Sequence, residues 1–167
     1  MSAELEKGKT AKHFLEVVVT YSSTCPASAA LSRQLIQENF KNEFRNQEID
    51  FKKLYDWLGT TKGIVATPHA QRSLATVKVE LKAPLSPAAL VNLIEEALQT
   101  PVQTAVKRED EQEFALRNGQ NLMFCEDAAR RLQQALASNP SIGAYRAEAR
   151  HMESLHPHDA VSVISRE

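Results

Sequence analysis

The sequence has no basic excess, and it lacks the short motifs that commonly identify a metal or nucleotide site. Its 20 lysines and arginines are balanced by 21 aspartates and glutamates, which gives a formal net charge of -1. A general nucleic-acid binder usually carries a strong basic excess, so we expect no nucleic-acid partner. No HExxH, CxxC or GxGxxG pattern is present, and therefore no single motif points to a reaction.

Long apolar segments are absent as well. No apolar run approaches the roughly 20 residues that a membrane-spanning helix needs. The first twelve residues, MSAELEKGKTAK, lack the apolar stretch of a signal peptide. We therefore expect a soluble, cytoplasmic protein with no membrane partner. In that reducing compartment the two cysteines, Cys25 and Cys125, need not pair, so catalysis, metal binding or burial are all open to them.

The remaining composition is that of one ordinary domain. Of the 167 residues, 43% are hydrophobic and 25% are charged. These values are close to the globular average and allow a sizeable core. We interpret residues 1–12 as a polar N-terminal tail and residues 13–167 as a single domain.

The apolar pattern predicts an α+β fold. Alternation and β-branched residues predict strands at 13–21, 74–82, 144–153 and 160–165, and helical spacing predicts helices at 27–44, 88–99 and 122–137. A short apolar cluster ends at Gly59, and the charged segment 102–117 is partly helical and stops at Asn118-Gly119. The expected inward residues are Ala75, Val77, Val79 and Leu81 in the second strand, Leu90, Leu93, Ile94, Ala97 and Leu98 in the second helix, and Phe124, Ala128, Leu132 and Leu136 in the third. Ser86 is the expected N-cap before Pro87. This order predicts an antiparallel sheet with helices on one face.

Side chains that can bind a metal occur in four places along the chain. These are Cys25, His69, the acidic run Glu109, Asp110 and Glu111, and the group Glu153, His156 and His158. A thiolate, an imidazole and a carboxylate can form a three-ligand site with an open position for water. A metal ion there would lower the pKa of that water toward neutrality. Zinc suits these ligands, and iron and manganese stay open because ligand types alone do not select the metal.

Each of these residues also has an ordinary structural explanation. A cysteine after a strand is often a small buried hydrophobe, and the acidic run could be the solvated face of a helix. His69 could be a loop histidine, and the His156–His158 segment a surface turn. Glu126 and Asp127 begin a predicted helix, where carboxylates favour the helix dipole. Cys125 falls within a helical pattern and is expected in the core.

Five segments together resemble the prokaryotic type IB GTP cyclohydrolases, a branch of the tunnelling-fold enzymes. They are VTYSSTCPASAALS, TPHAQRS, KREDE, FCEDAARRL and HMESLHPHDA, and the resemblance runs from about Phe14 to Ser165. It implies a tunnelling-fold-like antiparallel sheet, in the order strand-strand-helix-helix-strand-strand, with two long helices on one face and a helical insertion after the first strand. It also implies hydrolysis of GTP to formate and 7,8-dihydroneopterin triphosphate for folate and deazapurine tRNA-base synthesis, in a homo-oligomer.

The resemblance assigns roles to individual positions. Cys25, His69 and Glu111 match the ligands of a divalent metal: zinc, manganese or iron. Glu126 matches the carboxylate that anchors the purine. Glu153 and His156 match the acid-base and substrate-orienting pair, with Cys25 also at the catalytic centre and His158 in support. The weaker candidates for the phosphates of GTP are Ser28, Arg72, Lys107 and Arg108.

The chain departs from the family pattern in two ways. Ala27 replaces the second cysteine of the family's CPCS motif, which would impair any later proton transfer that depends on that thiol. Family members also carry an additional N-terminal half, so the chain corresponds to the C-terminal half and could work with a separate N-terminal half as partner. The alternatives are a truncated, non-catalytic module that binds a purine, a pterin or a partner subunit, and a different tunnelling-fold enzyme acting on pterins or a deazapurine nitrile.

Overall fold

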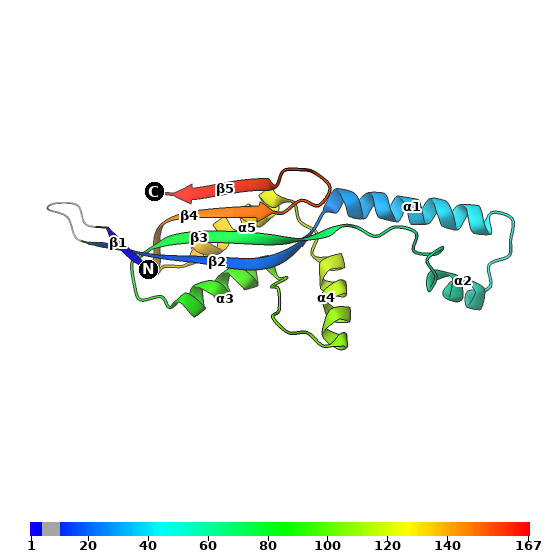
Figure 1. The fold of residues 1–167 in the computed structure, drawn as a ribbon, viewed down its shortest axis with the longest axis horizontal. Helices are drawn as coiled ribbons and strands as arrows, with labels where there is room; N and C mark the ends of the chain where they lie inside the picture. The colour runs from blue at the N-terminus through cyan, green and yellow to red at the C-terminus, as the bar shows by residue number, and fades with distance from the viewer. Residues whose placement is uncertain (5–10) are drawn as a thin grey trace.

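A five-stranded antiparallel sheet forms the centre of the computed structural model, which describes residues 1–4 and 11–167. The strands lie in chain order: β1 (Ser2–Glu4), β2 (Lys12–Thr24), β3 (Ala70–Leu81), β4 (Ile142–His151) and β5 (Ala160–Arg166). Each neighbouring pair is antiparallel. The long strands β2, β3, β4 and β5 are the four expected from the sequence, so the α+β prediction is confirmed (Figure 1).

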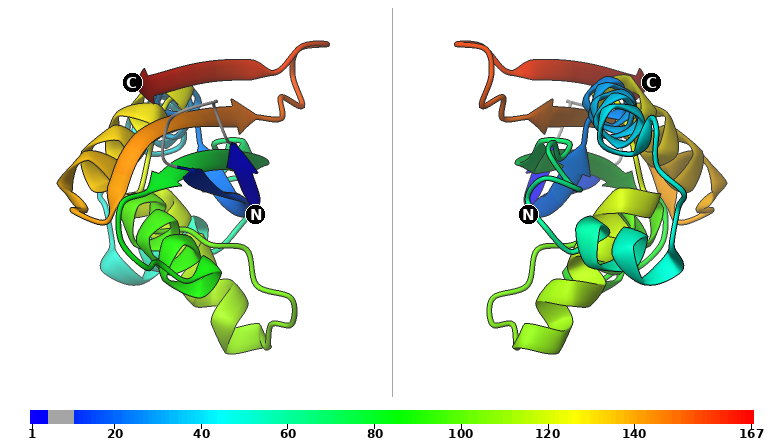
Figure 2. Two further views of the ribbon diagram at one scale, coloured as in Figure 1. Left: turned by 90° about the vertical axis from the view of Figure 1, so that its left-hand side faces the viewer. Right: turned by 90° about the vertical axis from the view of Figure 1, so that its right-hand side faces the viewer.

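Two helices cover one face of this sheet, as predicted. Helix α3 (Pro87–Leu98) packs on β2, and helix α5 (Cys125–Ser138) packs on β4 and β5. The two helices also contact each other, and both lie on the same side of the sheet in Figures 1 and 2. Ser86 caps α3 by accepting a hydrogen bond from the amide of Ala89 at 3.1 Å, with Pro87 in the first turn.

The core lies between the sheet and these helices. The alternation in β3 places Ala75, Val77 and Val79 on the helix-covered face, where all three are fully buried. The matching residues of the helices are equally buried: Leu90, Ile94, Leu98, Ala128, Leu132 and Leu136. Leu81, Leu93 and Ala97 are only partly buried because they lie at the margin of this core. Cys125 is buried at the start of α5, as expected.

The helical insertion after the first long strand projects away from the sheet. Helix α1 (Pro26–Phe44) continues directly from β2, and helix α2 (Phe51–Leu58) lies near its far end (Figure 1). Phe40, Phe44 and Trp57 form an aromatic cluster between them, with ring centroids 5.1 to 6.0 Å apart. Leu31 and Leu35 are 61% and 50% exposed because this part of α1 has no sheet beneath it. None of the helices in the described residues combines the length and apolar character needed to cross a membrane.

Three details differ from the sequence-based expectations. Phe124 was expected to point inward, but it is the N-cap residue of α5, with an extended backbone, and it is 47% exposed. Helix α4 (Arg108–Gln120) continues through Asn118 and Gly119 and is followed by Asn121 as C-cap. Ser2 to Glu4, inside the expected tail, pair with β2 as strand β1, whereas residues 5–10 of that tail lie outside the described residues.

Candidate active site at the end of the sheet

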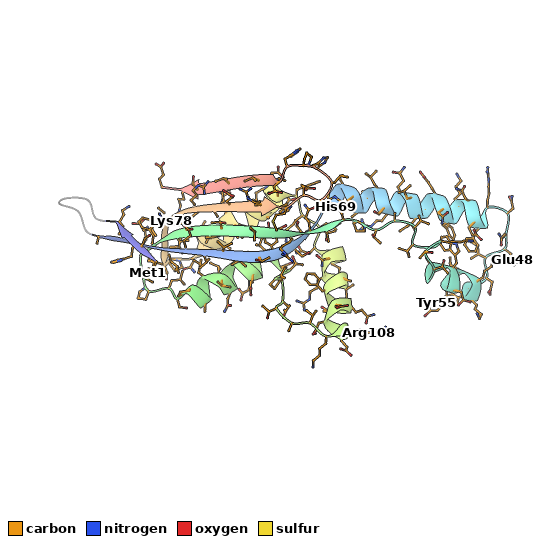
Figure 3. All side chains as sticks on the ribbon, in the orientation of Figure 1. Met1, Glu48, Tyr55, His69, Lys78 and Arg108 are labelled. Carbon is orange, nitrogen blue, oxygen red and sulfur yellow. The ribbon has the colours of Figure 1, made fainter. Side chains whose placement is uncertain are left out.

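The end of β2, the start of β3 and the end of β4 lie together at the end of the sheet where α1 begins. Since β2 and β3 are antiparallel, the end of β2 at Thr24 pairs with the start of β3 at Ala70. The end of β4 at His151 pairs with Ser73, and the amide of Met152 continues this pairing by bonding the carbonyl of Arg72 at 3.2 Å. The polar residues next to these three strand ends are therefore brought to one end of the sheet, near His69 in Figure 3.

Cys25, Ser28 and His69 form the first part of the site. The Cys25 amide donates to the carbonyl of His69 at 3.4 Å, so the two candidate ligands are directly linked through the backbone. Cys25 is half-buried and is the N-cap of α1, where its sulfur accepts from the amide of Ser28 at 3.5 Å. The hydroxyl of Ser28 accepts from the His69 amide at 3.1 Å.

Gln71 connects His69 to Glu153. The ring nitrogen Nδ1 of His69 lies 3.1 Å from Oε1 of Gln71. The amide nitrogen Nε2 of the same glutamine donates to Oε1 of Glu153 at 2.8 Å. Gln71 is buried, and it lies on the helix-covered face because it shares the parity of Ser73 and Ala75. The imidazole and the carboxylate are thus held in one hydrogen-bonded chain.

Beneath this chain lies a buried pair that the sequence analysis did not single out. Nε2 of His151 lies 2.9 Å from the hydroxyl of Tyr21, and both side chains are almost fully buried. Burial raises the pKa of Tyr21 well above its ordinary range, with the nearby Cys125 adding to the effect. Burial lowers the pKa of His151, while the carboxylates of Glu153 and Glu126 act against that shift. Glu126 and Glu153 therefore both lie close enough to influence the same buried imidazole.

We expect the protein to lose stability in acid because of His151. Burial lowers the pKa of His151 in the folded chain. In the unfolded chain the same imidazole is protonated near its ordinary pKa of about 6.5, whereas in the folded chain it stays neutral to a lower pH. The free energy of unfolding should therefore be constant above this pH and fall below it. Urea unfolding midpoints at about pH 8 and about pH 5.5 test this. His151→Gln should lose less stability between the two pH values, and an equal loss in both proteins would contradict the assignment.

Glu111 is not assembled with Cys25 and His69. It lies in the first turn of α4, which contacts β2 through its C-terminal part, where Asn118 accepts a hydrogen bond from Ser22 at 2.8 Å. Glu111 does line a cavity of about 710 Å³ that Gln71 also lines. Across residues 1–4 and 11–167, no group of three or more histidine, cysteine, aspartate or glutamate side chains is placed to hold a metal. The predicted three-ligand set is thus reduced here to two neighbouring residues.

The basic candidates are spread apart. Lys107 is the N-cap of α4 and Arg108 its first residue, and Figure 3 shows Arg108 at the end of α4 that points away from His69. Arg72 is exposed and lines the same cavity as Glu111. Of the four phosphate candidates, only Ser28 bonds directly to the Cys25–His69 pair. Lys107 and Arg108 are next to the acidic run in the sequence, but this did not predict their distance from His69. They lie at the end of α4 that points away from the sheet.

The acidic pair at the start of α5 divides into two roles. Asp127 accepts a hydrogen bond from the Phe124 amide at 3.0 Å, so it caps the helix. Glu126 is exposed at the first turn, and its carboxylate acts on the pKa of His151.

His156 is exposed and stacks on His158, with ring centroids 5.4 Å apart. The structure therefore brings Glu153 to the centre of the cluster, whereas His156 points to solvent on the connecting loop.

The sulfur of Cys25 and the ring nitrogen of His69 are atoms that can bind a divalent cation. A thiolate and an imidazole are ligands that zinc, and to a lesser extent iron and manganese, accept. A ligating histidine commonly donates its second ring N–H to an acceptor, and Gln71 supplies such an acceptor to His69. Cys25 and His69 are therefore suitable as two of the ligands, and the geometry of a third is not formed in the described residues.

Comparison with known proteins identifies the family of this chain. Residues 1–162 match the family model described as type I GTP cyclohydrolase folE2. Three proteins named GTP cyclohydrolase FolE2 are similar: the one from Bdellovibrio bacteriovorus is 63% identical over 99% of this chain and 54% of its own length. Those from Hydrogenovibrio crunogenus and Pseudoalteromonas translucida are 56% and 54% identical, over 91% and 98% of this chain and 50% and 54% of their own lengths. The chain thus spans about half the length of these curated relatives, and it belongs to the type I GTP cyclohydrolase FolE2 family.

Proposed function

We propose that this chain forms the catalytic half of a metal-dependent type IB GTP cyclohydrolase, which hydrolyses GTP to formate and 7,8-dihydroneopterin triphosphate. The observation that supports this most directly is the hydrogen-bonded cluster at the sheet edge. In this cluster Gln71 links the His69 imidazole to the Glu153 carboxylate, and the backbone amide of Cys25 bonds the carbonyl of His69, so the thiol lies beside them. Membership of the FolE2 family and the names of the relatives agree with this substrate.

In this proposal the side chains bind, orient and transfer protons around the guanine ring. Glu126 accepts hydrogen bonds from the N1–H and the exocyclic amine of guanine, since an ionised carboxylate is a pure acceptor. Glu153 moves a proton to or from a ring nitrogen as the imidazole ring of guanine opens. Cys25 and His69 would hold a zinc, manganese or iron ion, and such an ion would supply an activated water for attack at purine carbon C8. The exposed His156 would orient the substrate.

The third ligand requires a rearrangement in this proposal. Glu111 and Gln71 both line the 710 Å³ cavity, and α4 would have to move over that cavity to bring the carboxylate to Cys25 and His69. Helix α4 has no fully buried residue of its own, so moving it costs little apolar burial. The same cavity would then lie between the metal ligands and Arg72, which could bind a phosphate group of GTP.

We also propose that the active form is a homo-oligomer. Strand β5 is at the edge of the sheet, and its outward residues Val161 and Val163 are 45% and 47% exposed. An uncovered edge strand with apolar side chains tends to pair with another chain. Since the relatives are about twice as long, a separate N-terminal half is a second possible partner.

Formate release is the direct test of the proposed activity. The purified chain should be incubated with GTP and with zinc, manganese or iron(II) in separate reactions, and formate and the pterin product measured. Formate production that depends on added metal is the expected result. If a folded, metal-loaded chain releases no formate, alone or as part of its full-length protein, the cyclohydrolase proposal is wrong. The alternative of a non-catalytic module that binds a purine or pterin would then be favoured, consistent with the unassembled Glu111.

The role of Glu126 can be separated from helix capping with its neighbour. Glu126→Ala should raise the KM for GTP roughly ten- to hundredfold, because hydrogen bonds to a charged acceptor are worth about 1.5–3 kcal/mol. Metal content should not change. Asp127→Ala is the matched control: it removes the cap and lowers the unfolding free energy by about 1 kcal/mol. An unchanged KM in Glu126→Ala, or an equal rise in both variants, would remove the purine-anchoring role.

A further inference from the structure

We propose that Gln71 is a positioning residue that sets the tautomer of His69 and the orientation of the Glu153 carboxylate at the same time. Its two ends bond different groups, with Oε1 at 3.1 Å from His69 Nδ1 and Nε2 at 2.8 Å from Glu153 Oε1. The catalytic consequence rests on the proposed function, whereas the tautomer is a property of the chain itself.

The direction of each hydrogen bond follows from the chemistry of the groups. An ionised carboxylate can only accept, so the amide group that faces Glu153 must be the NH₂ of Gln71. The carbonyl oxygen of the same amide then faces His69, and a carbonyl oxygen can only accept as well. His69 must therefore carry its proton on Nδ1. Nε2 is left as the unprotonated nitrogen, which is the form that binds a metal ion.

The backbone explains why these three side chains meet. Ser23 pairs with Gln71 in the β2–β3 ladder, and Ser73 pairs with His151 in the β3–β4 ladder. The bond from the Met152 amide to the Arg72 carbonyl carries the second ladder one step further, so Glu153 comes to lie beside Gln71. Both side chains then point to the helix-covered face. A glutamine is long enough to span from there to the His69 ring.

Two substitutions separate the two functions of the amide. Gln71→Met has a similar length but can neither accept from His69 nor donate to Glu153. Gln71→Glu keeps an acceptor for His69 but loses the donor, and it places a second negative charge beside Glu153. A residue that only filled space would respond similarly to both changes. If Gln71 is a positioning residue, the tautomer of His69 should change in Gln71→Met only. The orientation of the Glu153 carboxylate should change in both variants.

The tautomer can be measured without metal or substrate. The ¹⁵N chemical shifts of the His69 ring in the metal-free chain distinguish a proton on Nδ1 from one on Nε2. We expect Nδ1–H in the wild-type chain and in Gln71→Glu, and a shift of population toward Nε2–H in Gln71→Met. A wild-type ring protonated on Nε2 would overturn the proposal outright.

Metal affinity and turnover give the remaining readouts. In competition with a chelator, Gln71→Met should bind zinc about 10- to 100-fold more weakly, as is typical when the partner of a ligating histidine is lost, and Gln71→Glu should bind about as tightly as wild type. Both variants should lower kcat for GTP by about 10- to 100-fold, through the misplaced carboxylate. Equal zinc affinity in Gln71→Met and wild type would contradict the metal side of the proposal, and unchanged kcat in both variants would contradict the carboxylate side.

Ser73→Ala is the matched control for removing a buried polar group from the same strand face. Its hydroxyl is fully buried, bonds the Ser23 hydroxyl at 2.8 Å and donates to the backbone carbonyl of Gln71 at 3.5 Å. In the described hydrogen bonds it contacts neither the Gln71 side-chain amide nor His69 or Glu153. It should leave the His69 tautomer and the zinc affinity unchanged. If the wild-type chain releases no formate, the proposed function fails, while the tautomer and zinc measurements still decide the role of Gln71.

Discussion

Replacing Cys25 with alanine is expected to abolish metal retention and to reduce formate release by roughly 10³-fold or more. The thiol belongs to one of the two candidate ligands that lie together in the described residues, and a metal ion contributes several kcal/mol of stabilisation to this class of reaction. The fold should survive, because Cys25 is half-buried and its loss costs mainly the N-cap of α1, about 1 kcal/mol. Metal content after dialysis, formate release and the urea midpoint are the three measurements.

The second cysteine provides the control for this experiment. Cys125 is buried in the core, where its thiol donates to the carbonyls of Ala149 at 3.1 Å and Ala160 at 3.3 Å. Burial also raises the pKa of this thiol, which disfavours the thiolate that a metal needs. Cys125→Ala should therefore keep the metal and lower stability by about 1 kcal/mol. If Cys25→Ala unfolds the chain while its metal content stays normal, Cys25 is a core residue and the metal proposal is wrong.

Glu153→Gln is expected to lower kcat by about 10²- to 10⁴-fold, which is the usual contribution of a general acid-base. The metal should stay bound, because the new side chain can still accept a hydrogen bond from Gln71 through its carbonyl oxygen. The affinity for GTP should change little. Single-turnover kinetics with a metal-loaded protein would separate the chemical step from substrate binding.

The matched control lies on the strand that leads to Glu153. Glu148 is on β4, but it points to the opposite face of the sheet, where it forms ion pairs with Arg146 at 3.5 Å and Arg150 at 3.0 Å. Glu148→Gln removes the same charge at a distance from the cluster and should leave kcat near the wild-type value. A kcat for Glu153→Gln that matches that of Glu148→Gln would show that Glu153 transfers no proton in the reaction.

Local sequence signals predicted the long strands and the helices, but not the burial of every residue in them. Alternation in β3 and the Ser86-Pro87 cap predicted a strand face and a helix start that the structure confirms, because both depend on residues close in the chain. Phe124 shows the limit of such signals. Its spacing matches the inward face of α5, but the helix begins one residue later, so the ring falls outside the periodic region.

The roles of the candidate site residues stay predictions, and only part of their geometry could be predicted from the sequence. Cys25, His69 and Glu153 were singled out from the sequence, and they lie in one cluster. Gln71 was missed, although its parity with Ala75 in β3 was a usable signal that it faces the helices. Glu111 was expected to complete the metal site, but its helix holds it away, and nothing in the segment 108–120 indicates how that helix docks.

The sequence by itself determined the strands, the helices, their order and the chemistry available at each strand end, since these depend on periodicity and capping over a few residues. Only the tertiary structure decided which polar groups meet. The bond between Gln71 and Glu153 joins residues 82 positions apart, and it exists because two antiparallel ladders stop at the same edge. Such long-range register depends on the packing of the whole sheet against α3 and α5. No local pattern contains it.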